Sequence, residues 1–192
     1  PNAPYYDKAY RGSWNGLTVI SISIGQGEVN ATPLQIANLG ATIANRGWFI
    51  TPHIVKDIQD EELDSLYTTR RYTMAQPSNY EIVVQGMRQA VIEGTCRAAE
   101  TPYYEVCGKT GTAQNPHGQD HSAFMGFAPM NDPKIAICVY VENGIWGATY
   151  GVPIGSLMIE QYLTGKLSPE SEEKAKIFEN RHIITSDDAS NK

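Results

Sequence analysis

Three consecutive segments with the composition of β-strands constrain the fold of this 192-residue chain more than any other feature. They span residues 105–113, 122–130 and 134–142, and the last of them is rich in β-branched residues. The tripeptide Asn131-Asp132-Pro133, which is typical of a tight turn, links the second segment to the third. Because a parallel crossover needs a far longer connection, the sequence predicts an antiparallel hairpin here.

Segments with helical character surround these strands. Apolar residues recur at helical spacing over 33–45, 79–93 and 153–163, and Ser78 stands where an N-cap of the second helix is expected. The segment 17–24, Leu-Thr-Val-Ile-Ser-Ile-Ser-Ile, is instead so rich in β-branched residues that it predicts a short strand or extended segment. The expected fold class is therefore α+β, an antiparallel sheet with helices packed on it.

Most of the chain is expected to belong to one domain. With 41% hydrophobic residues it can bury a sizeable core over 1–165, whereas 166–192 is charged and polar. This second part predicts a partly disordered C-terminal tail with an exposed helix over 169–180. The charged stretch 57–76 predicts a solvated loop or hairpin. The chain begins at Pro1 rather than Met, so we expect it to be a segment of a longer protein.

Charge and hydropathy disfavour two classes of function. A formal net charge of −6 without a basic stripe argues against binding to nucleic acid, because such affinity comes mainly from Lys and Arg. The longest apolar runs are too short to cross a bilayer. The cysteines form no metal-binding pair; Cys138 is expected to be buried, and a disulfide between Cys96 and Cys107 is left open.

The run Gly108-Lys109-Thr110-Gly111-Thr112-Ala113-Gln114 carries the chemistry. It places a cation, two hydroxyls and two glycines on one strand, which we expect at the edge of the sheet, facing a cleft. Lys109, Thr110 and Thr112 offer donors to a carboxylate, and Gly111 lets a substrate or a second backbone approach closely because it has no Cβ. This pattern indicates acyl transfer on a peptide with a free carboxylate end.

Nucleotide-binding motifs are incomplete. A phosphate-binding P-loop needs a glycine five residues before Gly108, and the chain has Tyr103 there. Gly25-Gln26-Gly27 begins a dinucleotide fingerprint, but Asn30 stands in place of the third glycine. The sequence therefore predicts no nucleotide cofactor.

A zinc site is also disfavoured. His117, Asp120 and His121 lie on a loop rich in Pro and Gly, without a further fixed ligand at a recognised spacing. No metal is therefore predicted. Asp120 and His121, followed by Ser122, are instead expected to hold this loop in shape.

Lys109-Thr110-Gly111 with its surroundings resembles the third active-site motif of the penicillin-recognising serine acyltransferases. Further similar segments occur in the family's order, at 23–27, 31–35, 44–47, 108–114 and 120–129. Over residues 17–165 the chain is thus similar to the C-terminal half of the transpeptidase domain of class B penicillin-binding proteins. Within that class it looks most like the penicillin-binding protein 2 group, the elongation-type peptidoglycan D,D-transpeptidases, with the division-type group left open.

The resemblance implies a penicillin-binding protein/β-lactamase-like transpeptidase fold and a serine acyl-enzyme. A serine attacks the carbonyl of a D-Ala-D-Ala stem peptide, releases D-alanine and passes the acyl group to an amine; β-lactam antibiotics inhibit by mimicking the donor. Lys109 would supply positive potential and help to move a proton. The hydroxyls of Thr110 and Thr112 would bind the substrate carboxylate beside Gly111, and the Thr112 N–H would be an oxyanion donor. No cofactor is implied.

The family's nucleophile motif, S-x-x-K, and its middle motif, S-x-N, are expected N-terminal to this chain. Ser171-Glu-Glu-Lys174 has the letters but follows the Lys-Thr-Gly strand, in a charged tail. Ser13-Trp14-Asn15 stands too close to Gly25 to be the middle motif. The isolated chain is therefore predicted to carry one wall of the site without the nucleophile, and to be inactive.

The resemblance also implies a setting for the longer protein. It would lie on the periplasmic side of the bacterial inner membrane, anchored through a preceding segment, and work beside a membrane glycosyltransferase. Two alternatives remain: a serine β-lactamase, which shares Lys-Thr-Gly, and a non-catalytic penicillin sensor or scaffold module. No nucleic-acid partner is expected.

Overall fold

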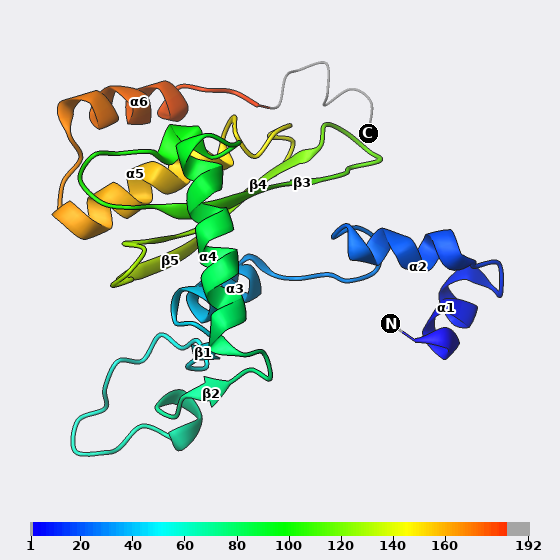
Figure 1. Cartoon of the computed structure of the whole chain (residues 1–192). Coiled ribbons are helices and arrows are strands. Elements are labelled where there is room, and N and C mark those ends of the chain that lie inside the picture. The colour runs from blue at the N-terminus through cyan, green and yellow to red at the C-terminus, as the bar shows by residue number, and fades with distance from the viewer. Residues whose placement is uncertain (1, 184–192) are drawn as a thin grey trace. The chain divides into compact units, whose positions relative to one another are not determined.

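The computed structural model describes residues 2–183, which form two compact units (Figure 1). The first unit ends at Thr32 and holds two short helices, α1 (Ala3–Tyr10) and α2 (Gly16–Ser23). Tyr6 is buried in this unit, where its ring stacks on the rings of Tyr10 and Trp14. The second unit begins at Pro33 and carries the main sheet.

The prediction of a strand over residues 17–24 is wrong, because this segment forms α2. Asn15 caps the helix: its side-chain oxygen accepts a hydrogen bond of 2.9 Å from the Leu17 N–H, and its own N–H donates to the Thr18 hydroxyl at 3.3 Å. These contacts give partners to amides that a helix start leaves unpaired. They outweigh β-propensity, whose whole scale spans only about 1 kcal/mol.

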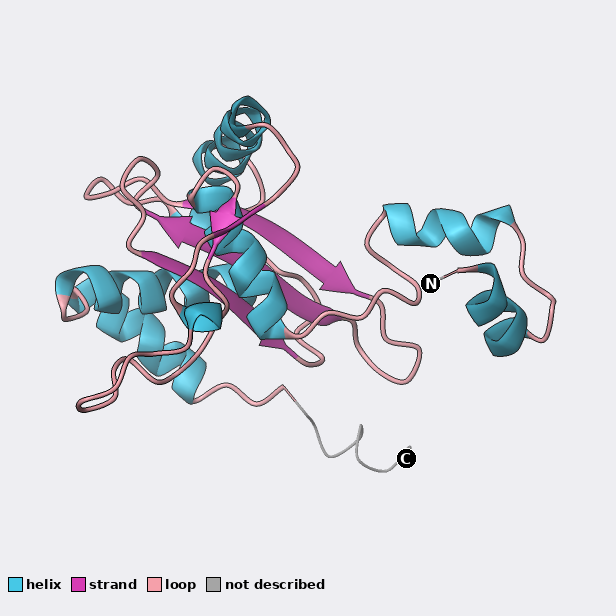
Figure 2. Cartoon of the chain, turned by 90° about the horizontal axis from the view of Figure 1, so that it is seen from below, coloured by secondary structure: helices cyan, strands magenta, loops and turns pink. Residues whose placement is uncertain are grey.

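The second unit is built on a three-stranded antiparallel sheet, as predicted (Figure 2). Its strands are β3 (Cys107–Ala113), β4 (His121–Ala128) and β5 (Ile135–Val141), in that spatial order. β3 therefore lies at an edge of the sheet. The strand ends differ from the predicted ones by at most two residues, as is usual for element boundaries.

Helices cover both faces of this sheet. α3 (Pro33–Ala44) and α4 (Pro77–Ile92) pack on one face, around the buried side chain of Phe127. α5 (Gly151–Thr164) packs on the other face, around Phe124. Side chains alternate along each strand, so the face of any residue of β3 follows from its position.

The helices predicted at 33–45, 79–93 and 153–163 are confirmed. Ser78, however, is not the cap of α4: the helix begins at Pro77, whose missing N–H costs nothing in the first turn, and Gln76 is the N-cap. Burial in α3 is concentrated near its C-terminal end, since Leu34 and Leu39 are 61% and 52% exposed.

A small two-stranded sheet lies between α3 and α4 in the sequence. Its strands β1 (Trp48–Phe49) and β2 (Arg71–Tyr72) pair antiparallel, and the chain between them includes the 3-10 turn η1 (Ser65–Tyr67). The excursion over 57–76 thus takes the predicted form of a loop that returns as a hairpin. A second 3-10 turn, η2 (Arg97–Ala99), follows α4.

The C-terminal helix α6 (Pro169–Glu179) packs against α5. Ser171 of α6 is buried and its hydroxyl donates to Glu160, whose second oxygen accepts the Ser168 N–H at 2.8 Å. The helix predicted over 169–180 is confirmed, and most of its residues are exposed as predicted, whereas Ser171 is buried. The division into 1–165 and 166–192 remains a prediction. The disorder predicted for the last residues falls on 184–192, outside the described residues.

Over residues 2–183, every helix is too short or too polar to cross a membrane. The longest helix, α4, carries two charged residues with ion-pair partners: Glu81 pairs with Arg46, and Arg88 pairs with Glu100.

Candidate active site

Lys109 lies exposed on the edge strand β3, on the face that α3 and α4 cover further along the sheet. Its Nζ donates a hydrogen bond of 2.7 Å to the carbonyl oxygen of Thr110. β3 pairs only with β4 in the part of the chain that the structure describes, so its second edge is not covered by a strand. The predicted edge position of the Lys-Thr-Gly segment is thereby confirmed.

Gly108 fixes the position of this segment relative to β4. A Cβ on Gly108 would lie 2.5 Å from Cε2 of Phe124, and a Cβ on its partner Gly126 would lie 2.5 Å from Cζ of the same ring. The ring therefore occupies the space above both glycines. This packing holds the backbone next to Lys109 at a set distance from the core.

Thr110 and Thr112 lie on the opposite face of β3, the one that α5 covers. The Thr110 hydroxyl lies 2.7 Å from Oγ1 of Thr95, which belongs to the turn after α4. A Cβ on Gly147, in the loop before α5, would lie 3.0 Å from Thr110 Cβ. Thr110 is thus enclosed by two segments that sequence reasoning did not connect to the site.

Gly111 leaves room mainly for β4. A Cβ there would lie 3.3 Å from Cβ of Ala123, its partner in the register. The loop before α5 also approaches here, since a Cβ on Gly147 would lie 2.8 Å from the Gly111 carbonyl oxygen. The close backbone approach expected at Gly111 therefore comes from within the chain.

Thr112 pairs in register with Ser122, which is fully buried. The Ser122 hydroxyl oxygen accepts a hydrogen bond of 3.0 Å from the Gly151 N–H, at the start of α5. Ser122 of β4 thus connects the site strand β3 to the helix α5.

Asp120 and His121 bind backbone amides of the surrounding loops. The Asp120 carboxylate accepts the Asn115 N–H at 3.1 Å, and its carbonyl accepts the Ile145 N–H at 2.8 Å. The His121 Nδ1 accepts the Asn143 N–H at 3.0 Å. These contacts tie the loop between β3 and β4 to the loop after β5.

No three metal-ligating side chains gather at one place within residues 2–183. Nδ1 of His121 and the carboxylate of Asp120 already accept backbone hydrogen bonds. The arrangement gives a metal no preformed set of ligands.

The two literal motif matches have other roles in the fold. The Ser171 hydroxyl donates to Glu160, and Lys174 pairs with Glu170 at 2.8 Å on the surface of α6. Ser13 lies in the first unit, in the connection between α1 and α2. A buried serine bound to a carboxylate and a solvated lysine do not form a nucleophile and its base.

Cys96, Cys107 and Cys138 are free thiols. The disulfide left open for Cys96 and Cys107 does not form. Burial raises the pKa of all three thiols, and that of Cys107 to about 12. Thiols with raised pKa values are poor nucleophiles at neutral pH.

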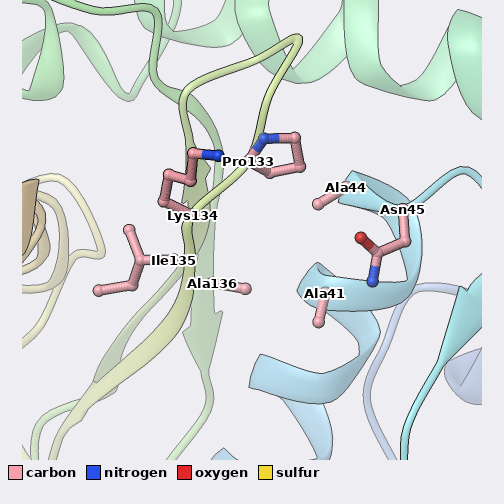
Figure 3. Close-up of a pocket in the computed structure, with 7 residues that line it drawn as sticks. All are labelled: Ala41, Ala44, Asn45, Pro133, Lys134, Ile135 and Ala136. Carbon is pink, nitrogen blue, oxygen red and sulfur yellow. The ribbon is translucent and has the colours of Figure 1, made fainter.

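Two hollows of the second unit lie away from β3. One, of about 150 Å³, lies where the end of α3 faces the start of β5 (Figure 3) and is lined by Ala41, Ala44, Asn45, Pro133, Lys134, Ile135 and Ala136. The other, of about 400 Å³, is formed by the loop of residues 52–67. Neither hollow is the cleft expected beside β3, which stays a prediction.

Comparison with known proteins identifies the family. Residues 6–156 match the family described as penicillin binding protein transpeptidase domain. The peptidoglycan D,D-transpeptidase MrdA of Acinetobacter baumannii is 33% identical over 175 residues, which cover 78% of this chain and 25% of that protein. This chain therefore belongs to the penicillin-binding protein transpeptidase family.

Solved structures agree with this assignment and with the predicted fold. Pseudomonas aeruginosa PBP2 in complex with WCK 5153 is similar with a TM-score of 0.73 and 36% identity, over 88% of this chain and 38% of that one. The imipenem acyl-enzyme of penicillin-binding protein A from Mycobacterium tuberculosis is similar with a TM-score of 0.62 and 32% identity, over 74% and 33%. This chain spans about a quarter of the length of MrdA and about a third of these solved chains.

Proposed function

We propose that this chain forms the Lys-Thr-Gly wall of a peptidoglycan D,D-transpeptidase that cross-links stem peptides through a serine acyl-enzyme. The observation that carries the proposal is the edge strand β3, which presents Lys109 on one face and Thr110 and Thr112 on the other, in a chain of this family. The names of the relatives, a D,D-transpeptidase and an imipenem acyl-enzyme, support acyl transfer and β-lactam binding rather than a sensor without turnover or a β-lactamase.

Each residue of the wall has a separate part. Lys109 supplies positive charge at the mouth of the site and helps to move the proton of the nucleophile. The hydroxyls of Thr110 and Thr112 donate hydrogen bonds to the terminal carboxylate of the stem peptide, and bonds to a charged acceptor are the stronger kind. The Thr112 N–H donates to the oxyanion as the serine adds to the carbonyl. Loss of one such donor typically costs ~2.7–4 kcal/mol of transition-state stabilisation.

The serine nucleophile belongs to a part of the domain outside this chain. Contacts support both literal motif matches as structural: Ser171 donates to Glu160, and in the other match Asn15 caps α2. Large apolar side chains stand exposed on α2, at its C-cap and on α3, as expected where the rest of a domain would cover them. They are Leu17, Ile20, Ile24, Leu34 and Leu39, each more than half exposed.

The donor in this reaction is a stem peptide that ends in D-Ala-D-Ala, and the acceptor is an amine of a neighbouring strand. β-Lactams block the site by acylating the same serine. We place the longer protein on the periplasmic side of the inner membrane, anchored through an N-terminal segment, beside a membrane glycosyltransferase. No cofactor takes part.

Labelled penicillin tests this function directly. The full-length protein is expected to gain one covalent adduct per molecule by mass spectrometry and to cross-link stem peptides. The isolated 192-residue chain is expected to gain none. A full-length protein without an adduct would overturn the proposed function, and an adduct on the isolated chain would show that the nucleophile lies within it.

A pair of lysine variants tests the wall itself. In the full-length protein, Lys109→Met is expected to slow acylation by roughly 100-fold, the effect of losing one electrostatic stabiliser. Lys134→Met is the matched control, because Lys134 is also exposed, in the turn before β5, and pairs only with Asp132 among the ion pairs of the described residues. Equal acylation rates for the two variants would exclude β3 as the wall of the site.

A further inference from the structure

Thr95 contacts the site strand from outside the sheet, 15 residues before Thr110 in the sequence. It lies in the turn between α4 and η2, and its Oγ1 is 2.7 Å from Oγ1 of Thr110 on β3. Either hydroxyl can donate in this pair. The sequence offers no motif that marks Thr95, so only the fold brings it to the site.

The two neighbours of Thr95 fix its position. Gly94 lets the chain turn back on the last turn of α4, since a Cβ there would lie 2.8 Å from Ala90 Cα. The Cys96 N–H then donates to the Ala90 carbonyl at 2.9 Å, and the Cys96 side chain is fully buried in the core behind β3. Thr95 is thus held from both sides while its own side chain stays exposed next to Thr110.

We propose that Thr95 is a positioning residue for acyl transfer: it donates to the Thr110 hydroxyl oxygen and so directs the Thr110 hydrogen toward the carboxylate of the substrate. This inference rests on the proposed function, in which Thr110 binds that carboxylate. Each hydroxyl has one hydrogen to donate and lone pairs to accept with. In the order Thr95 to Thr110 to carboxylate, the Thr110 hydroxyl accepts one hydrogen bond and donates one, so its single hydrogen is left for the carboxylate.

A bound carboxylate selects this order over the reverse one. If Thr110 donated to Thr95, its oxygen lone pairs would face the negative charge. With the carboxylate as final acceptor, each hydrogen bond polarises the next and strengthens it. Without the Thr95 hydroxyl, Thr110 loses this restraint and its O–H can rotate away to solvent.

The test compares two probes on the full-length protein, penicillin G and its methyl ester, which lacks the charged carboxylate. Thr95→Val keeps the side-chain shape and removes the hydroxyl, and it is expected to slow acylation by penicillin G about 10-fold, as for a hydrogen bond to a charged group. Acylation by the methyl ester is expected to change less than about twofold. Thr95→Ser retains a hydroxyl and is expected to restore the rate with penicillin G.

The outcomes separate this inference from the function on which it rests. If the wild-type protein is not acylated at all, the proposed function fails. If the wild type is acylated and Thr95→Val matches it with penicillin G, or slows both probes equally, the positioning role is overturned. Thr69→Val is the control for a generic effect of removing a hydroxyl, because Thr69 is exposed on the loop before β2. This variant is expected to leave both acylation rates unchanged.

Discussion

The Gly151 amide donates a hydrogen bond of 3.0 Å to the Ser122 hydroxyl oxygen, joining the first residue of α5 to the strand beside the Lys-Thr-Gly segment. Both residues are buried. The contact gives a partner to one of the amides that a helix start leaves without an intrahelical acceptor. Ser122 also pairs in register with Thr112, so the position of α5 is coupled to that of the site strand.

Replacing Ser122 by alanine is expected to destabilise the protein by about 1–3 kcal/mol, because the buried Gly151 N–H then lacks its acceptor. Urea unfolding followed by tryptophan fluorescence measures this loss. The control is Ser78→Ala in the exposed first turn of α4, which is expected to change stability by less than about 0.5 kcal/mol. Similar unfolding curves for the two variants would contradict a structural role for the Ser122 contact.

Two helical glycines are expected to respond in opposite directions to the same substitution. A Cβ on Gly155 of α5 would lie 2.5 Å from Cδ1 of Phe124, so Gly155→Ala should destabilise by about 1–3 kcal/mol through overpacking. A Cβ on Gly86 of α4 would meet nothing within 4 Å, so Gly86→Ala should stabilise by about 0.5–1 kcal/mol through helix propensity. Thermal unfolding of both variants checks the two signs. Melting temperatures that shift in the same direction would show that local packing does not determine the effect of these substitutions.

Docking of α6 on α5 is expected to weaken in acid. Burial raises the pKa of Glu160, but hydrogen bonds from Ser171 and Ser168 outweigh it and hold the pKa below the ordinary value of 4.5. A carboxyl with a lowered folded-state pKa stabilises the fold above its unfolded pKa, and this contribution is lost as the pH falls through the folded value. The stability difference between wild type and Glu160→Gln should therefore shrink below pH 4.5.

The exposed Glu173 on α6 provides the comparison for this pH effect. Glu173→Gln should follow the wild-type dependence of unfolding free energy on pH. A Glu160→Gln variant that also follows it, with the same slope in acid, would show that the bonds to Ser168 and Ser171 do not favour the charged carboxylate.

Thiol labelling of the native protein is expected to follow burial. Cys96 and Cys107 are fully buried, and burial raises the pKa of Cys107 to about 12, whereas Cys138 is partly exposed. Iodoacetamide near neutral pH should therefore modify Cys138 first, and all three cysteines should react in denaturant. Mass spectrometry of the labelled peptides reads the order, and early labelling of Cys107 would be incompatible with its burial.

The sheet was predictable because its strands are encoded locally. The segments around Phe124 and Ile137 contain β-favouring residues, and the short Asn131-Asp132-Pro133 link between them permits only antiparallel pairing. The strand predicted at 17–24 failed because composition alone did not account for the Asn15 cap. The predicted start of α4, residue 79, also differs from the observed one, because the helix begins at Pro77 and not after Ser78.

Within the site, the sequence identified the residues on β3 but not those that support them. Lys109 to Thr112 form a recognisable run, whereas Thr95 and Gly147 meet Thr110 only through the fold. Contacts between segments far apart in the chain leave no periodic pattern in the sequence. Thr95 follows the turn glycine Gly94, and Gly147 lies in the loop before α5.

The ring of Phe124 fills the volume of three absent methyl groups, on Gly108, Gly126 and Gly155, which come from two strands and a helix. Because such an interior has no spare volume, these four positions are not free to diverge one at a time. A larger residue at any of the glycines requires a smaller one at 124, so we expect compensating changes to appear together in related sequences. The residues that can replace Gly108, next to Lys109, are thus limited by α5, which packs on the opposite face of the sheet from Lys109.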